Sequence, residues 1–146
     1  MSTDSPAMLP VQRPDVDLRE MSPLALAFVG DAVLELLVRA RLVGSTRLPP
    51  GRLHAEATRY VSAKAQFREL SALEPLLTEA EAAVLRRGKN ASKATVAKHA
   101  TAQEYRASTG LECLLGWLYL QGELDRVGQL FEALWQAGGD PARAES

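Results

Sequence analysis

The sequence predicts an all-α fold, and three observations support this prediction. Apolar residues recur at helical spacing in successive segments, and helix start and stop signals separate these segments. No segment shows the alternation of apolar and polar residues that marks a half-buried strand. Hydrophobic residues make up 47% of the 146 residues, which is enough for the core of a single domain without disulfides.

The first half of the chain is expected to hold two helices. The first begins at Ser22-Pro23, where an N-cap residue precedes a proline at the first helical position, and it ends at Gly44. Apolar residues then step at helical spacing through residues 53–73, which predicts a second helix that Pro75 closes.

Two capping boxes organise the second half of the chain. Residues 78–81 and 101–104 each pair a threonine with a glutamate three positions later, a pattern typical of helix N-termini. The helix after the first box is expected to stop at Gly88, and the helix after the second at Gly122. A last apolar stripe predicts a helix over residues 124–138.

These elements predict one domain with short extensions. Residues 1–20 read as a flexible leader, residues 21–138 as the folded domain and residues 139–146 as a short tail. No segment has the long apolar run of a membrane helix or of a secretory signal, so a cytoplasmic protein without membrane contact is expected. The single cysteine, Cys113, lies among leucines, which suggests a buried thiol in a reducing compartment.

Charge is unevenly distributed along the chain. The net charge is −1, which does not by itself indicate nucleic-acid binding. Between Glu81 and Glu104, however, there is no acidic residue, and several basic residues follow one another, as phosphate binding would require. The other interpretation is a solvated helix face. The basic residues of this stretch are Arg86, Arg87, Lys89, Lys93 and Lys98.

Two acidic residues stand where an apolar stretch predicts none. Asp31 lies within the run from Leu24 to Val38, and Glu112 lies in a similar run beside Leu111. A buried carboxylate is costly unless it is paired, hydrogen-bonded or bound to a metal, so the two acids suggest a shared site for a hard cation such as magnesium. Spacing alone does not decide this, because each acid could also lie on a solvent-facing flank.

Four short motifs, taken in order, resemble the ribonuclease III family. Residues 28–35 (FVGDAVLE) resemble its signature, and residues 109–116 (TGLECLLG) resemble its second acidic motif. Residues 62–66 (SAKAQ) and 87–91 (RGKNA) resemble motifs of one branch, Mini-ribonuclease III. The resemblance spans residues 21–137, so the domain is expected to be a ribonuclease III-like catalytic domain.

The resemblance implies a function as well as a fold. It implies an all-helical, dimer-forming endonuclease domain that cuts double-stranded RNA, with one active site per subunit. That branch lacks the separate double-stranded RNA-binding domain, and no such domain is expected after the last helix of this sequence. The resemblance further implies maturation of the ends of 23S ribosomal RNA, and the missing domain suggests help from a large-subunit ribosomal protein.

Two residues of this sequence match catalytic residues of the family that it resembles. Asp31 and Glu112 are expected to be both catalytic residues and magnesium ligands, in a metal-assisted hydrolysis that leaves 5′ phosphates. Leu24, Ala27 and Thr109 occupy places where the resemblance implies acids in classical ribonuclease III, so the number of magnesium ions stays open.

Further residues are expected around this pair. Glu35 and Thr109 are candidates for indirect support of the metal site, although for Glu35 an ion pair with Arg39, four residues later, is the favoured interpretation. Binding to the RNA duplex is expected to rely on phosphate contacts, because side chains cannot reach into the A-form major groove. The candidates for RNA binding are Lys64, Arg87, Lys89, Asn90, Lys93 and Lys98.

Two other functions fit an all-helical chain of this size. One is a non-catalytic RNA-binding or ribosome-assembly module with the same fold, which the presence of both Asp31 and Glu112 disfavours. The other is a helical interaction protein, which would leave the four ordered motifs unexplained.

Overall fold

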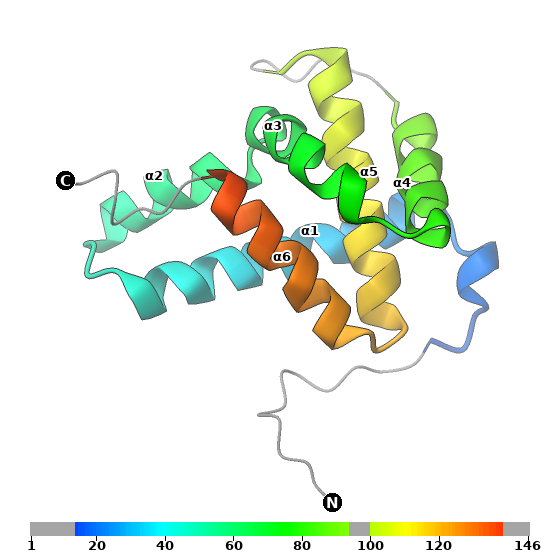
Figure 1. Ribbon diagram of the computed structural model, residues 1–146, viewed down its shortest axis with the longest axis horizontal. Coiled ribbons are helices and arrows are strands. Elements are labelled where there is room, and N and C mark those ends of the chain that lie inside the picture. The colour runs from blue at the N-terminus through cyan, green and yellow to red at the C-terminus, as the bar shows by residue number, and fades with distance from the viewer. Residues whose placement is uncertain (1–13, 94–99, 139–146) are drawn as a thin grey trace, which may run out of the picture.

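The computed structural model describes residues 14–93 and 100–138, and these residues form helices joined by short connections (Figure 1). No strand occurs within these ranges, so the predicted all-α class is confirmed. The α-helices are α1 (Pro23–Ser45), α2 (Pro50–Val61), α3 (Ala63–Leu73), α4 (Glu79–Ala91), α5 (Ala102–Leu120) and α6 (Leu124–Gly138), and the 3-10 helices are η1 (Leu18–Glu20) and η2 (Glu74–Leu76).

Helix α5 forms the centre of the fold. It packs most extensively against α1, which crosses it, and α4 and α3 flank it, while α6 packs mainly against α3 (Figure 1). Leu111, Leu114 and Leu115 of α5 are fully buried, together with Leu34 and Val38 of α1. Burial of such apolar side chains supplies the main driving force for folding.

Two glycines allow α1 and α5 to touch backbone to backbone. A Cβ added to Gly30 would lie 1.7 Å from the carbonyl oxygen of Glu112. A Cβ added to Gly116 would lie 1.9 Å from the carbonyl oxygen of Leu26. No side chain fits at either position, so this crossing depends on glycine on both helices.

The expected helix start signals are confirmed. The hydroxyl of Ser22 accepts a hydrogen bond from the Leu24 amide at the start of α1. Thr78 and Thr101 each form a complete capping box with the glutamate three residues later, at the starts of α4 and α5. Gly122 follows α5 with a φ of 81°, a left-handed conformation that favours glycine.

The expected single helix over residues 53–73 is wrong, because the chain breaks at Ser62 into α2 and α3. Ser62 has an extended backbone, with φ −67° and ψ 154°, and its hydroxyl accepts a hydrogen bond from the Ala65 amide at 3.1 Å. Ser62 therefore caps a new helix. The change of direction leaves Phe67 39% exposed, whereas Gln66 and Leu70 face the core.

The expected stop at Gly88 is also wrong, because α4 continues to Ala91. Gly88 is buried inside the helix, and an added Cβ would lie 2.6 Å from the Cβ of Cys113. Here glycine serves the close approach of α4 to α5 rather than a helix end. Lys89 and Asn90 consequently lie on the last turn of α4 and not in a loop.

The chain ahead of α1 is partly described. η1 lies within the expected leader, with Asp17 as its N-cap, and Leu18 packs partly against the core. Residues 1–13 and 139–146, most of the expected leader and all of the expected tail, lie outside the described residues. Among the helices that are described, none is both long and apolar enough to span a membrane.

Candidate active site

The crossing of α1 and α5 brings Asp31 and Glu112 together. Asp31 directly follows Gly30 on α1, and Glu112 lies one turn before Gly116 on α5, so both acids flank the glycine contact. Burial is the main cause of the raised pKa of Glu112, and the carboxyl group of Asp31 lies close enough to raise this pKa further through its charge and through direct contact. Two residues that lie in separate apolar segments of the sequence thus form one acidic pair.

Of the two positions that the sequence left open for Asp31, buried or on a solvent-facing flank, the structure shows the flank. Its side chain is exposed, on the flank of the buried stripe of α1 that includes Leu34 and Val38. The apolar run around Asp31 is therefore only partly core, and Phe28 within it is 83% exposed. Glu112, in contrast, is partly buried.

Two side chains hold the carboxylate of Glu112. Nε2 of Gln66 donates a hydrogen bond to Oε2 of Glu112 at 3.1 Å, and the hydroxyl of Ser108 donates to the same oxygen at 3.4 Å. Burial raises the pKa of Glu112 to about 7, the hydrogen bond from Gln66 lowers it, and the charge of Asp31 raises it. The group therefore titrates near neutral pH.

The donor set fits a magnesium ion, although it is small. Both groups offer carboxylate oxygens, the ligand type that magnesium prefers, and their mutual repulsion favours a cation between them. Within residues 14–93 and 100–138, no group of three or more His, Cys, Asp or Glu side chains gathers in a metal-binding arrangement. A magnesium ion at this pair would therefore complete its coordination with water or substrate oxygens.

The two candidates for indirect support of the metal site make their hydrogen bonds elsewhere. Glu35 accepts a hydrogen bond from Arg39 at 2.9 Å, so the predicted Glu35–Arg39 ion pair is confirmed. The hydroxyl of Thr109 donates to the carbonyl of Tyr105 at 3.0 Å and lies 3.3 Å from the Ser92 hydroxyl. Neither set of hydrogen bonds includes Glu112.

Sequence reasoning missed Gln66 and Ser108 as neighbours of Glu112. Gln66 lies in the SAKAQ motif and shares an apolar stripe with Leu70 and Leu73, so a polar residue on a core-facing stripe was the available signal. Ser108 lies one turn before Glu112, next to Thr109, which the sequence suggested for this supporting role.

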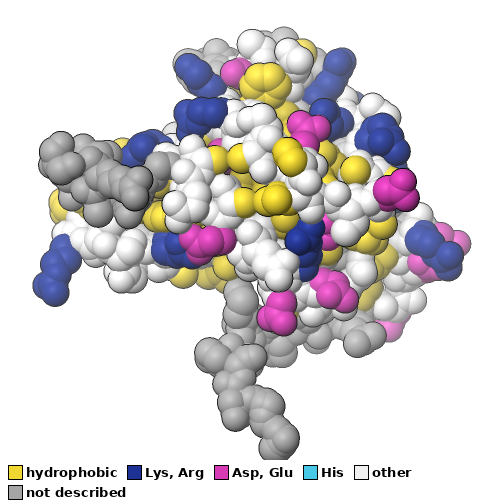
Figure 2. All heavy atoms as spheres, viewed as in Figure 1, with side chains coloured by type: hydrophobic (Ala, Val, Ile, Leu, Met, Phe, Trp, Pro, Cys, Tyr) yellow, Lys and Arg dark blue, Asp and Glu magenta, His cyan; other side chains and the backbone are white. Residues whose placement is uncertain are grey.

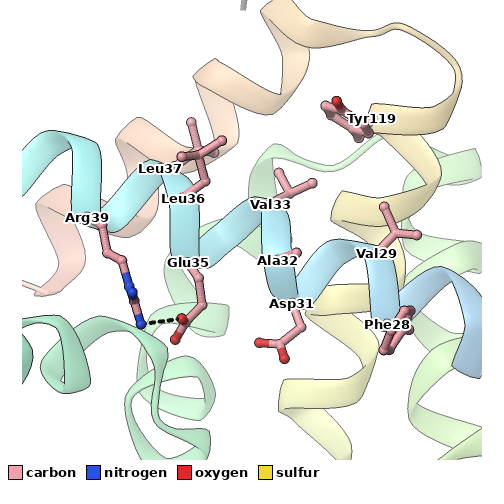
Figure 3. A pocket seen from close by; sticks show the side chains of 10 residues that line it. All are labelled: Phe28, Val29, Asp31, Ala32, Val33, Glu35, Leu36, Leu37, Arg39 and Tyr119. Carbon is pink, nitrogen blue, oxygen red and sulfur yellow. Dashed lines mark hydrogen bonds and ion pairs between the residues drawn. The ribbon is translucent and has the colours of Figure 1, made fainter. Parts of the chain in front are cut away.

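A shallow apolar cavity opens beside Asp31 along α1 (Figure 3). Its volume is about 720 Å³, and Val33, Leu36 and Tyr119 are among its lining residues. In Figure 3, Asp31, Glu35 and Arg39 project from one side of the α1 ribbon, and Val29 and Val33 from the other. The acidic pair thus borders an exposed apolar surface.

The candidate RNA-binding residues that the structure describes lie on α3, on α4 and just beyond α4. Lys64 is exposed on α3, Arg87 and Asn90 are exposed on α4, and Lys89 is partly buried. Lys93 is exposed just beyond α4, and Lys98 lies outside the described residues. In the view of Figure 2, Lys and Arg side chains are frequent over the upper part of the molecule, where α3, α4 and the start of α5 lie in Figure 1.

The family model named Ribonuclease III domain matches residues 24–123. The chain belongs to the ribonuclease III family. The match covers all four motifs and both acids of the pair. This is a family of endoribonucleases, so the expected recognition, fold and enzyme class are confirmed.

Similar proteins place this ribonuclease III family member in one branch. It is 44% identical over 112 residues to the Mini-ribonuclease 3 of Thermoanaerobacter sp. (strain X514), covering 77% of this chain and 79% of that protein. It is 45% identical over 113 residues to the Mini-ribonuclease 3 of Symbiobacterium thermophilum, covering 77% and 87%. The crystal structure of a Fusobacterium nucleatum protein matches with a TM-score of 0.74 and 27% identity, covering 82% of this chain and 96% of the other.

Proposed function

We propose that this protein is a magnesium-dependent endoribonuclease that cleaves double-stranded RNA, with Asp31 and Glu112 as its catalytic residues. The observation that carries this proposal is the α1–α5 crossing, where the contact of Gly30 with the Glu112 backbone places the two carboxyl groups side by side. Burial is the main cause of the raised pKa of Glu112, and the charge of Asp31 raises it further. Two carboxylates that repel each other, one exposed and one anchored, suit a cation site that faces a substrate. The Mini-ribonuclease 3 relatives support the same activity.

Each acid has its own task in this proposal. When bound, magnesium supplies activation of the attacking water and offsets charge on the phosphoryl oxygens. Asp31 is exposed, so its carboxylate would hold the cation on the side from which the substrate phosphate group arrives. Glu112 is held in place by Gln66 and Ser108 and supplies the second ligand. Hydrolysis of the bond between phosphorus and the 3′ oxygen leaves 5′-phosphate products.

The RNA is proposed to bind mainly through its phosphates. The exposed side chains of Lys64 and Arg87 lie on α3 and α4, the two helices that flank α5 with its Glu112. Contacts with phosphates and shape recognition suit an A-form duplex, whose major groove is too narrow for side chains to read. Lys89, Asn90, Lys93 and Lys98 complete the proposed set.

A homodimer is part of this proposal. Phe28 is 83% exposed and Leu36 is 47% exposed on α1, and both line the apolar cavity next to Asp31. Clusters of exposed apolar side chains commonly mark protein interfaces. A second copy on this surface would place two acidic pairs along one duplex, each opposite a different strand.

The cellular role is proposed from the similarity to Mini-ribonuclease 3. It comprises maturation of 23S ribosomal RNA ends in the cytoplasm, with help from a large-subunit ribosomal protein.

One assay tests the activity. The protein is incubated with a long RNA duplex, with and without magnesium, beside Asp31→Asn and Glu112→Gln. We expect metal-dependent cleavage by the wild type and none by either variant, with duplex binding retained. Binding without cleavage by the wild type would select the RNA-binding or ribosome-assembly module. Neither binding nor cleavage would select an interaction protein, and a variant that cuts at the wild-type rate would remove that acid from the site.

A further inference from the structure

We propose that Gln66 is a positioning residue of the active centre, which anchors one oxygen of Glu112 and leaves the other as the ligand oxygen. The inference rests on the proposed function of the Asp31–Glu112 pair. Gln66 is fully buried on α3, whereas Glu112 lies on α5, so the contact joins two helices that only the tertiary fold brings together.

The orientation of the Gln66 amide follows from its neighbours. Nε2 lies 2.9 Å from the carbonyl oxygen of Val61 and 3.1 Å from Oε2 of Glu112, and both of these atoms are acceptors. If the amide were turned over, its own oxygen would face two acceptors, an arrangement without any hydrogen bond. Gln66 therefore acts as a donor with two fixed partners, one at the end of α2 and one in the acidic pair.

The break at Ser62 makes this contact possible. Because α2 ends at Val61 and α3 starts at Ala63, the first turn of α3 brings Gln66 back to the Val61 carbonyl. That carbonyl belongs to the last turn of α2, where backbone oxygens lack helical partners. The helix break and the carboxylate of Glu112 are thus linked through one amide group.

Both hydrogen bonds to Glu112 go to the same oxygen. Gln66 and Ser108 donate to Oε2, and no N–H or O–H within residues 14–93 and 100–138 donates to Oε1. Oε1 accordingly keeps its lone pairs for a cation. An anchored carboxylate is oriented before the ligand arrives, which reduces the cost of binding.

Stability alone does not account for a glutamine at this position. Oε1 of Gln66 is buried and has no hydrogen-bond partner among the described residues. A buried carbonyl without a partner destabilises the folded state. An apolar side chain of similar volume would avoid this penalty. The benefit of glutamine therefore lies in the hydrogen bonds that its amide group donates to the Val61 carbonyl and to Glu112.

The test replaces Gln66 by methionine, which conserves volume and removes the donor. The matched control is Glu69→Met on the same helix, since Glu69 is also fully buried but its carboxylate has no hydrogen-bond partner among the described residues, Glu112 included. Binding of Mn²⁺ alone is measured by electron paramagnetic resonance without RNA. The magnesium concentration for half-maximal cleavage and the thermal midpoint are measured in parallel.

We expect Gln66→Met to weaken Mn²⁺ binding and to raise the magnesium requirement by about 10- to 100-fold. Its thermal midpoint should stay close to the wild-type value, because the variant removes the unpartnered Oε1 of Gln66 but also leaves the Val61 carbonyl without its donor. Glu69→Met should bind Mn²⁺ as the wild type does. If Gln66→Met does not fold, Gln66→Asn, whose shorter side chain cannot reach Glu112, is measured in its place. Wild-type Mn²⁺ affinity in a folded Gln66 variant, or an equal loss in Glu69→Met, would overturn the inference.

The result separates this inference from the proposed function. If the wild type fails to cut duplex RNA, but Gln66→Met still loses Mn²⁺ affinity, the proposed function fails and the positioning role of Gln66 stands. If the wild type cuts RNA and the Gln66 variant matches it in metal affinity, the proposed function stands and the positioning role fails.

Discussion

Gly30 of α1 lies directly against the backbone of Glu112 on α5, with the position of its absent Cβ only 1.7 Å from the Glu112 carbonyl oxygen. The same contact sets the distance between the two helices and places Asp31, the next residue, beside the Glu112 side chain. Fold and candidate site therefore share one point of the structure.

Gly30→Ala should damage both stability and activity. The added methyl group would meet backbone atoms that cannot rotate away, so α1 and α5 would have to separate. We expect a loss of about 3 kcal/mol in the free energy of unfolding, at the upper end of the usual overpacking cost, and loss of RNA cleavage. Urea unfolding and a cleavage assay measure the two effects.

Gly44 provides the matched control on the same helix. An added Cβ there meets nothing within 4 Å, so Gly44→Ala should stabilise the protein by up to about 1 kcal/mol through helix propensity. Equal stability of Gly30→Ala and Gly44→Ala would contradict the backbone contact.

Cleavage should depend on pH through Glu112. Its pKa is raised to about 7, so at pH 6 the carboxyl group is mostly protonated and binds a cation poorly. We expect the cleavage rate at low magnesium concentration to rise as pH increases through 7, and the midpoint to move to lower pH when magnesium is increased. Cleavage rates measured from pH 5.5 to 8.5 at two magnesium concentrations test this. If the midpoint of the pH profile is the same at both magnesium concentrations, Glu112 is not a magnesium ligand.

Stability should fall with rising pH because of Glu69. Burial raises the pKa of Glu69 to about 8 from a usual 4.5. The side chain also lies against the C-terminal end of α6, since a Cβ added at Gly138 would be 3.1 Å from Oε2 of Glu69. The dipole of α6 disfavours a negative charge at this end of the helix. The folded state holds the proton more tightly than the unfolded state, so this stability is fully present below pH 4.5 and is lost as pH rises through 8. The expected loss is on the order of a few kcal/mol.

Glu69→Met should remove this part of the pH dependence. The thermal midpoint of the variant should exceed that of the wild type by a margin that grows from pH 5 to pH 8.5. Glu112 adds a dependence of the same sign, so the variant should retain a shallower slope. A constant difference between variant and wild type across this range would show that Glu69 does not titrate as inferred.

The basic residues should contribute jointly to RNA binding. Replacing Lys64, Arg87 and Lys89 together by alanine should weaken duplex binding and lower the slope of log K against log salt by about 0.9 for each phosphate that is no longer neutralised. Arg47, exposed just after α1, is the control: Arg47→Ala should leave the slope unchanged. Binding titrations at several salt concentrations give the slopes, and a triple variant with the wild-type slope would exclude these residues as phosphate ligands.

The apolar surface beside Asp31 should hold the dimer together. Phe28→Ser combined with Leu36→Ser should convert a dimer to a monomer in light scattering and greatly reduce duplex cleavage. Leu76→Ser is the control, because Leu76 is 51% exposed on η2 and does not line the cavity beside Asp31. A wild type that is monomeric at working concentrations would contradict the proposed dimer outright.

The sequence by itself determined the helix starts, the all-α class and the two acids of the candidate site. Capping signals at Ser22, Thr78 and Thr101 could be read because each depends on hydrogen bonds between residues at most three positions apart. The motifs around Asp31 and Glu112 are likewise short and continuous, which is why the family could be expected from them.

Tertiary packing decided what these local signals could not. The role of Gly88 depends on Cys113 of another helix, and the exposure of Asp31 depends on which side of α1 meets α5. Gln66 and Glu112 are 46 positions apart and touch only because α3 starts anew at Ser62 and packs beside α5. Contacts of this kind follow from the distances and angles between packed helices, which no spacing within a single helix encodes.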